Sequence, residues 1–489
     1  MHVSVPANSP RPLVPAMPNS LQQWARLTRR RWLESGAAGV LGCSLPNMLA
    51  AQAKAAAGPQ AAAKRVLVLY EQGGLSHVDT WDPKPDTFVD HRSPHKPIST
   101  SVPGIQFTDL LPRTAAIAHK LAVVRSMHHE KLGADAHPNG TQYALSGAHP
   151  AQPVEMPDIG CVVTRTIGTE NPTLPPYVMI PGNHEQAAET RTGFLPASYK
   201  VFKTGGSNLA DPRWKVGDLL ARPENAETRL GGRRQLLTSL DRSFASVDAA
   251  GRTFDGMDRF YEQAFDTLTS PTVLDAFNVQ GESAEVRERY GAGHRGACYL
   301  LGRKLIESGV RFVTVDVRWP LLDDTPGGFN LNWDHHDLIY APGSCGTVRD
   351  KAGGEGRYGI GHWVMMGSVD RAFSALVTDL DERGLLDETL VCLVTEFGRT
   401  PKLNKFQGRD HWTHAYSLVF AGAGVPGGRV IGQTDKDGGF VVSEGHTPED
   451  YAATIYEKLG IDRDRPLFTA ANRPVYFGHL GEPIRGLFG

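Results

Sequence analysis

Histidine and carboxylate side chains gather in four short stretches of this chain, each downstream of an apolar run. The first stretch is EQGGLSHVDTWDPKP at residues 71–85, and the others are NWDHHD at 332–337, EFGRTP at 396–401 and GRDHWTH at 408–414. Asp, Glu and neutral His bind divalent cations, and a bound cation polarises oxygen atoms and activates water. The residue types therefore predict a metal site that supports hydrolysis, with Zn, Ca, Mg or Mn as candidate ions.

Each candidate ligand also has a plainer structural explanation. His77 could cap a turn, and Glu396 could cap a helix or pair with a cation. Either of the adjacent residues His335 and His336 could be a ligand or an ordinary surface histidine. The combination favours a metal site, because several separate strand ends carry the same kinds of side chain.

Two arginines in the same stretches, Arg399 and Arg409, could hold an anionic ester through the two-pronged guanidinium group. Arg409 could instead pair with its neighbour Asp410 and brace the loop that carries His411. Both explanations remain open at the level of the sequence.

Apolar runs are predicted to form the strands that position these residues. Most runs are continuous, as expected for parallel strands buried on both faces, and helical periodicity follows at 287–308, 368–383 and 447–459. This alternation predicts a doubly wound, mostly parallel α/β sheet whose strand ends meet at one ligand-binding edge. We expect residues 59–489 to form one such domain with a long insertion at about 181–285. The predicted strands are 65–70, 121–125, 177–180, 310–317, 390–395 and 417–421.

The composition, with 40% hydrophobic and 21% charged residues, is that of a globular protein. A formal net charge of −2 gives no basic field for nucleic acid, and the five dispersed cysteines argue against a disulfide framework. We expect no transmembrane segment in the mature chain, because no apolar run there reaches the length of a membrane span. The glycines at 291–293 partly match a dinucleotide-binding fingerprint but lie between helical patterns, so we discount them.

The N-terminus has the features of a twin-arginine export signal. Thr28 precedes three arginines, a mildly apolar stretch at 36–50 and small residues suited to cleavage at 51–57. We therefore expect residues 1–58 to be a signal and linker that the twin-arginine translocase recognises. The mature protein would be periplasmic or extracellular, and a lipid anchor at Cys43 is a less favoured variant of this prediction.

Several longer motifs carry a family resemblance. They include GGLSHVDTWDPKP, SVPGIQFTDLLP, AHPNGTQYALSG, GFLPASYKVF, RERYGAG, WDHH, RGLLDETLVCLVTEFGRTPKLN, GRDHW, GGRVIGQTD and EDYAATIYEKLGID. From about residue 28 to the C-terminus, the chain resembles the bacterial exported family catalogued as domain of unknown function 1501. The resemblance implies an alkaline-phosphatase-like fold, shared with the sulfatases, and a one- or two-metal site that hydrolyses phosphate or sulfate esters.

The resemblance also implies ligands, position by position. The late strand of that superfamily ends in an Asp-His metal pair, where this chain has Glu396 and Phe397. Glu can replace Asp as a ligand, but Phe cannot replace His. The downstream metal-binding histidine matches His411, and the middle pair matches Asp334 with one of the two following histidines.

The nucleophile position departs from the superfamily. Sulfatases carry Cys or Ser ten residues before the glycine of a helix end, and in AHPNGTQYALSG that position, counted back from Gly147, is His137. The superfamily's arginine position holds Thr141. His137 is then a ligand or a nucleophile, or activated water attacks, or the site no longer catalyses.

These observations lead to a functional prediction with one rival. We predict an exported, metal-dependent hydrolase that acts on a sulfate or phosphate ester of a small molecule or carbohydrate. The rival is a catalytically silent periplasmic binding or assembly protein that retains the fold. The predicted metal ligands are His77, Asp79, Asp334, His336, Glu396 and His411, and the predicted catalytic residues are His137, Arg399 and Arg409.

Overall fold

A computed structural model describes most of the chain after the predicted signal. The described residues are 61–129, 134–182, 190–206, 208–216, 271–317, 331–341, 344–345 and 357–489. The predicted signal and linker at 1–58 lie outside them, as does most of the predicted insertion. Among the described residues, no helix has the length and hydrophobicity needed to cross a bilayer.

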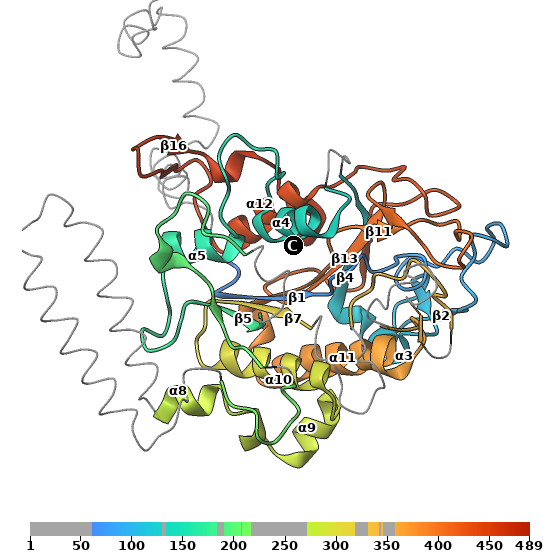
Figure 1. Cartoon of the computed structure of the whole chain (residues 1–489), viewed down its shortest axis with the longest axis horizontal. Helices are drawn as coiled ribbons and strands as arrows, with labels where there is room; N and C mark the ends of the chain where they lie inside the picture. Colours follow the sequence, from blue (N-terminus) through green and yellow to red (C-terminus); the bar gives the residue numbers. More distant parts are fainter. Residues whose placement is uncertain are drawn as a thin grey trace, which may run out of the picture. The chain divides into compact units, whose positions relative to one another are not determined.

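An eight-stranded sheet runs through the centre of the described structure (Figure 1). Its strand order is β14-β4-β13-β10-β1-β7-β5-β6. Every neighbouring pair is parallel except the two that involve β13, so β13 alone runs against the other seven strands. The strands are β1 (Arg65–Tyr70), β4 (Leu121–Met127), β5 (Tyr177–Pro181), β6 (Phe202–Lys203), β7 (Phe312–Asp316), β10 (Thr389–Val394), β13 (Tyr416–Ala421) and β14 (Arg429–Ile431).

Helices cover both faces of this sheet, with α3, α8, α9, α10 and α11 on one side and α4, α5 and α12 on the other (Figure 1). Successive residues of β1 serve the two sides, because Leu67 and Leu69 pack in one hydrophobic core while Val66 and Val68 pack in the other. The predicted mostly parallel, doubly wound fold is therefore confirmed. The helices are α3 (Pro112–Ala116), α4 (His137–Ser146), α5 (Ile159–Ile167), α8 (Pro271–Ala276), α9 (Ala284–Tyr290), α10 (His294–Glu307), α11 (Ser368–Glu382) and α12 (Pro448–Lys458).

One predicted helix is divided in two. The periodicity at 287–308 predicts a continuous helix, but α9 ends at Tyr290 and α10 begins at His294. The chain turns at Gly291, whose φ of +98° is rarely adopted by residues with a side chain. The prediction of one helix was wrong because the apolar spacing continues across a glycine-rich turn.

Smaller elements beyond the sheet carry the predicted site residues. A two-stranded hairpin, β11 (Gly398–Arg399) with β12 (His411–Trp412), follows β10. Segment 331–341 approaches the end of β1, where the Trp333 amide donates to the Gln72 carbonyl at 2.9 Å. The remaining strand pairs are β2 (Pro97–Ser99) with β3 (Gln106–Thr108), β8 (Ser344–Cys345) with β9 (Arg357–Tyr358), and β15 (Leu467–Phe468) with β16 (Pro474–Val475).

Candidate metal centre

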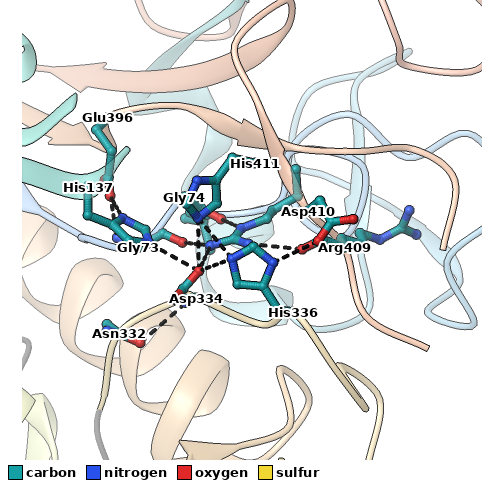
Figure 2. A network of polar contacts seen from close by, with 12 residues as sticks. Gly73, Gly74, His137, Asn332, Asp334, His336, Glu396, Arg409, Asp410 and His411 are labelled. Atoms are coloured by element: carbon teal, nitrogen blue, oxygen red, sulfur yellow. Dashed lines mark hydrogen bonds and ion pairs between the residues drawn. The ribbon is translucent and has the colours of Figure 1, made fainter. Parts of the chain in front are cut away.

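One carboxylate oxygen, Oδ1 of Asp334, is the meeting point of three imidazole rings (Figure 2). The Nε2 atoms of His137, His336 and His411 lie 3.0, 2.9 and 3.1 Å from it. His137 is the first residue of α4, His411 lies in β12, and the other two come from segment 331–341. Three histidines and one carboxylate thus converge from three separate parts of the fold.

The opposite nitrogen of each ring is held by a hydrogen-bond acceptor. Nδ1 of His137 lies 2.8 Å from Glu396 Oε1, and Nδ1 of His336 lies 2.8 Å from Asp410 Oδ1. Nδ1 of His411 lies 2.5 Å from the backbone carbonyl of Asp135, which can only accept. Metal-binding histidines commonly donate their second ring N–H in this way, which fixes the ring and leaves the other nitrogen available.

The residues present fit a metal ion. Nε2 of His137 is buried and makes no hydrogen bond of normal geometry, although it faces Asp334. Two ligand atoms bonded to one ion at about 2.0–2.1 Å in tetrahedral geometry lie about 3.4 Å apart. The contacts of 2.9–3.1 Å to Asp334 Oδ1 are close to that spacing. Among the described residues, His137, Asp334 and His411 form the group of possible ligands close enough to share an ion.

The electrostatics of the cluster depend on a few strong contacts. Burial alone would raise the pKa of Asp334, but Arg399 and the three histidines outweigh it and hold the pKa well below its usual range. Burial alone would lower the pKa of His137, but its contacts with Asp334 and Glu396 raise it. Burial lowers the pKa of His411, which favours the neutral ring that metal binding needs.

Glu396 lies behind His137 rather than beside the other possible ligands. Its side chain is fully buried, and its Oε1 accepts the Gly73 amide at 2.8 Å in addition to facing His137. Its Oε2 accepts the Tyr70 hydroxyl at 3.2 Å. These contacts fit an outer partner that orients His137 better than the direct ligand that the sequence predicts.

Arg399 fastens Asp334 to the turn after β1. Its Nη2 donates to Asp334 Oδ1 at 2.6 Å and to the Gly73 carbonyl, while its Nε donates to the Gly74 carbonyl at 3.0 Å. Its Nη1 donates to the backbone carbonyl of Arg409 at 2.9 Å. The guanidinium is completely buried, so Arg399 positions a possible metal ligand and is poorly placed to receive a substrate anion.

The two glycines are required where this turn passes segment 331–341 at Gly73 and the Phe397 and Arg399 side chains at Gly74. Gly73 has φ +108° and Gly74 has φ +75°, both in the region that L residues rarely adopt. A Cβ on Gly73 would lie 2.5 Å from the Trp333 amide nitrogen, and one on Gly74 would lie 2.8 Å from the Phe397 ring. The two glycines therefore permit the close approach between the turn after β1 and segment 331–341, which places Asp334 among the histidines.

The structure places three predicted site residues elsewhere. Asp79 is completely buried against Arg409, with Oδ2 2.9 Å from its Nε, and it accepts the Tyr340 hydroxyl at 2.7 Å. The Arg409 side chain points away from Asp334 (Figure 2) and also donates to backbone carbonyls, including that of Thr400 at 2.9 Å. His77 Nε2 lies 2.7 Å from the Gly438 carbonyl. These contacts connect the first stretch to surrounding loops and not to the histidine cluster.

Sequence reasoning missed the outer partners of the cluster. An Arg409–Asp410 pair was one of two explanations that the sequence left open, but Arg409 pairs with Asp79 and Asp410 pairs with His336. The sequence did contain a partial indication that Asp410 lies near the cluster, because Asp410 directly precedes the predicted ligand His411 in GRDHW. The backbone carbonyl of Asp135 and the hydroxyl of Tyr70 carry no sequence signal, because they depend on how distant segments pass one another.

A scan against protein-family models gives one match. The model described as protein of unknown function (DUF1501) covers residues 63–488, nearly the whole described structure. No curated protein matches the sequence significantly.

Similar solved structures include three hydrolases. Phosphonate monoester hydrolases from Silicibacter pomeroyi and Agrobacterium radiobacter are both 12% identical, with TM-scores of 0.37 and 0.38. Their alignments cover 86% and 87% of this chain and 76% and 77% of theirs. A sulfatase from Pseudoalteromonas sp. is 11% identical, with a TM-score of 0.34, over 85% of this chain and 71% of its own.

Proposed function

The chain belongs to the DUF1501 family, and on that premise we propose that it is a metal-dependent hydrolase of an anionic oxyester, a sulfate or phosphate ester. The observation that carries the proposal is the convergence of three Nε2 atoms on Asp334 Oδ1, each ring being held from behind by an acceptor. A structural histidine needs no such arrangement, whereas a metal ligand does.

The ligand set favours a transition metal or zinc among the candidate ions. His137 and His411 would supply imidazole nitrogens and Asp334 one carboxylate oxygen, the three groups close enough to share an ion, and His336 would be a fourth, neighbouring candidate. Calcium and magnesium prefer sites made mainly of oxygen atoms. Imidazole nitrogens suit zinc, whereas manganese, like calcium and magnesium, is suited to oxygen ligands, so we propose zinc as the ion.

The bound ion would polarise the ester and lower the pKa of a water molecule at the site. The protein's part is to position the ligands: Glu396 and Asp410 orient His137 and His336, and Arg399 fixes Asp334. Because α4 begins at His137, the positive end of its dipole lies at the cluster and favours a substrate anion there.

Water is the proposed nucleophile. Thr141, the hydroxyl residue closest in sequence to His137, accepts hydrogen bonds from the Tyr70 hydroxyl at 2.8 Å and from Gln72 Nε2 at 3.1 Å. It is buried among these partners and is unsuited to attack a substrate. His137 itself faces a carboxylate from each ring nitrogen, which suits a ligand better than a nucleophile.

One observation favours the rival function, a catalytically silent binding protein. Arg399 and Arg409, the two arginines that we expected to hold the ester anion, donate instead to carbonyls and carboxylates of the protein. A hydrolase would then have to bind its anion through the metal and the start of α4. A protein that only keeps a metal would have no such requirement.

Two measurements on one preparation separate these functions. Metal content is determined by mass spectrometry for the wild type and for His411→Ala, with His479→Ala, a partly exposed histidine outside the cluster, as the control. The same samples are then assayed on sulfate, phosphate and phosphonate esters. The proposal expects about one ion per chain, ester hydrolysis by the wild type and His479→Ala, and loss of both properties in His411→Ala.

Two results count against the hydrolase. Metal-free wild type with unchanged stability in His411→Ala would exclude the metal centre. Metal-loaded protein that hydrolyses no ester of the panel would favour the binding protein.

We also propose that the chain is exported by the twin-arginine route to the periplasm or beyond, with residues 1–58 as its signal and linker. Replacing Arg29, Arg30 and Arg31 with lysine should retain the protein in the cytoplasm. Cell fractionation checks this, and unchanged export of the variant would contradict it.

A further inference from the structure

A second cavity, separate from the histidine cluster, opens among α3, α11 and the turn between α9 and α10. Its volume is about 860 Å³, within the range of small-molecule sites. None of its lining residues belongs to the group His137, Asp334, His336 and His411. Gly293 borders open space, because a Cβ there would meet no atom within 4 Å.

Aromatic rings form one wall of this cavity. Trp363 is 69% exposed, so its indole face is open to a ligand in the cavity that it lines. It begins a π-helical segment, Trp363–Gly367, a geometry often found at functional sites. Beside it, the rings of Tyr358 and His362 are stacked 3.9 Å apart at 8°. The wall thus offers flat surfaces on which a ring can pack.

Polar groups complete the lining and leave an excess of positive charge. Arg371 is already paired with Glu288, at 2.5 Å. The carboxylate of Asp370, behind the cavity, accepts the backbone amides of Arg113 and Thr114 at 3.0 and 2.7 Å. Arg113 is exposed and lines the cavity, so its guanidinium can reach a ligand there although Asp370 lies nearby, and Asn208 adds an amide.

The cavity is connected to the centre of the molecule through its inner wall. Arg295 lines it, and the Arg295 guanidinium makes a buried pair with Glu71, Nη2 to Oε2 being 3.0 Å. The same carboxylate accepts the Trp333 indole N–H at 2.7 Å. The charge of Arg295 is thus neutralised from inside, and the cavity differs in chemistry from the histidine cluster.

We propose that this cavity binds an anionic saccharide. The apolar face of a sugar ring packs on an indole face, while its hydroxyl groups bond to planar polar side chains such as those of Asn208 and Glu288. Arg113 would receive the sulfate or carboxylate of the ligand as a bidentate partner. The inference does not depend on a metal at the histidine cluster.

Calorimetric titration of the purified protein tests the proposal. The probes are a chondroitin sulfate tetrasaccharide, a sulfated galactan tetrasaccharide and cellotetraose as the neutral counterpart. Trp363→Ala should weaken binding of the sulfated probes at least tenfold. Arg113→Gln should reduce the preference for sulfated over neutral probes at least fivefold. Phe468→Ala, which removes another exposed aromatic ring outside the cavity, should bind like the wild type.

The His411→Ala variant separates this site from the proposed metal centre. Binding that persists in His411→Ala and is lost in Trp363→Ala assigns the saccharide to the cavity, whether or not the protein hydrolyses esters. Three results would overturn the proposal: no binding of either sulfated probe, equal binding by Trp363→Ala and wild type, or loss of binding in His411→Ala. Circular dichroism of each variant ensures that a loss reflects binding and not unfolding.

Discussion

The Nε2 atoms of His336 and His411 lie 3.0 Å apart. Nδ1 of each ring faces an acceptor, Asp410 Oδ1 for His336 and the Asp135 carbonyl for His411. If both rings are neutral, the two Nε2 lone pairs therefore point at one another, which is unfavourable unless a cation or a shared proton lies between them. A cation bound between the two rings would therefore stabilise this arrangement most when both rings are neutral.

Metal removal should therefore destabilise the wild type and leave His411→Ala unaffected. A metal present at 100 times its Kd stabilises the folded state by about 2.7 kcal/mol. Thermal unfolding with and without a chelator measures this effect. The partly exposed variant His479→Ala should respond like the wild type. A chelator response of the same size in His411→Ala would argue against this centre.

Asp410→Asn should weaken metal binding by about 10- to 100-fold without abolishing it, because Asp410 orients His336 through Nδ1 at 2.8 Å. Metal titration monitored by calorimetry gives the Kd. Asp464→Asn is a matched control, because Asp464 holds the partly exposed His479 at the same distance of 2.8 Å. Equal Kd values for the two variants would show that Asp410 does not contribute to metal binding by orienting His336.

Gly73→Ala should cost about 2–4 kcal/mol of unfolding free energy and lower the metal content, because the new Cβ would lie 2.5 Å from the Trp333 amide nitrogen and displace Asp334. Gly104→Ala is the control, since Gly104 has φ +82° but a Cβ there would meet nothing within 4 Å. That variant should cost only about 1–2 kcal/mol. Urea unfolding compares them, and similar losses would show that only backbone strain matters.

Arg409→Met should destabilise the protein by roughly 3–5 kcal/mol, because it leaves the Asp79 carboxylate buried without its cation. Metal content per folded chain should remain that of the wild type. The sequence-based prediction for Arg409, a contact with the substrate, expects the reverse: normal stability and lost ester binding. Urea unfolding combined with metal analysis distinguishes the two roles.

Asp158 should make stability depend on pH. Burial raises the pKa of this carboxyl to about 7, despite contacts with the Arg191 amide and the Tyr177 hydroxyl that lower it. The native state therefore keeps a proton that the unfolded chain loses near its ordinary pKa of 3.8, and stability falls as pH rises from about 4 to 7. Asp158→Asn should remove this component, which is roughly 4 kcal/mol at most. Parallel pH profiles of wild type and variant would refute the assignment.

Six strands of the central sheet could be predicted because buried strands have continuous apolar sequences, whereas the short edge strands β6 and β14 were missed. The continuous apolar runs at 65–70 and 390–395 lie side by side as β1 and β10, paired in parallel from Arg65 and Thr389 onward. The reversed direction of β13 could not be predicted, since an apolar run carries no sign of orientation. The break between α9 and α10 was not predicted either, because the helical spacing of apolar residues continues across the glycine turn that separates the two helices.

The sequence predicted the residue types of the candidate site, histidines and carboxylates, but not which of the candidate residues come together. His137, Asp334, His336, Glu396 and His411 do come together, from separate elements and loops of the fold. Asp79 lies nine residues beyond β1, and the path of its loop carries it to Arg409 instead. Whether a carboxylate faces an ion or an arginine depends on that path. Metal binding by the assembled residues remains a prediction.

The order of the ligands along the chain has a consequence for how the protein matures. His137 and Glu396 are 259 residues apart, and His336 and His411 are 75 residues apart. Closing such long loops is entropically costly in an unfolded chain, so no early fragment could gather the set. A metal captured here would therefore mark a chain in which segments distant in the sequence, from His137 to His411, have already folded together.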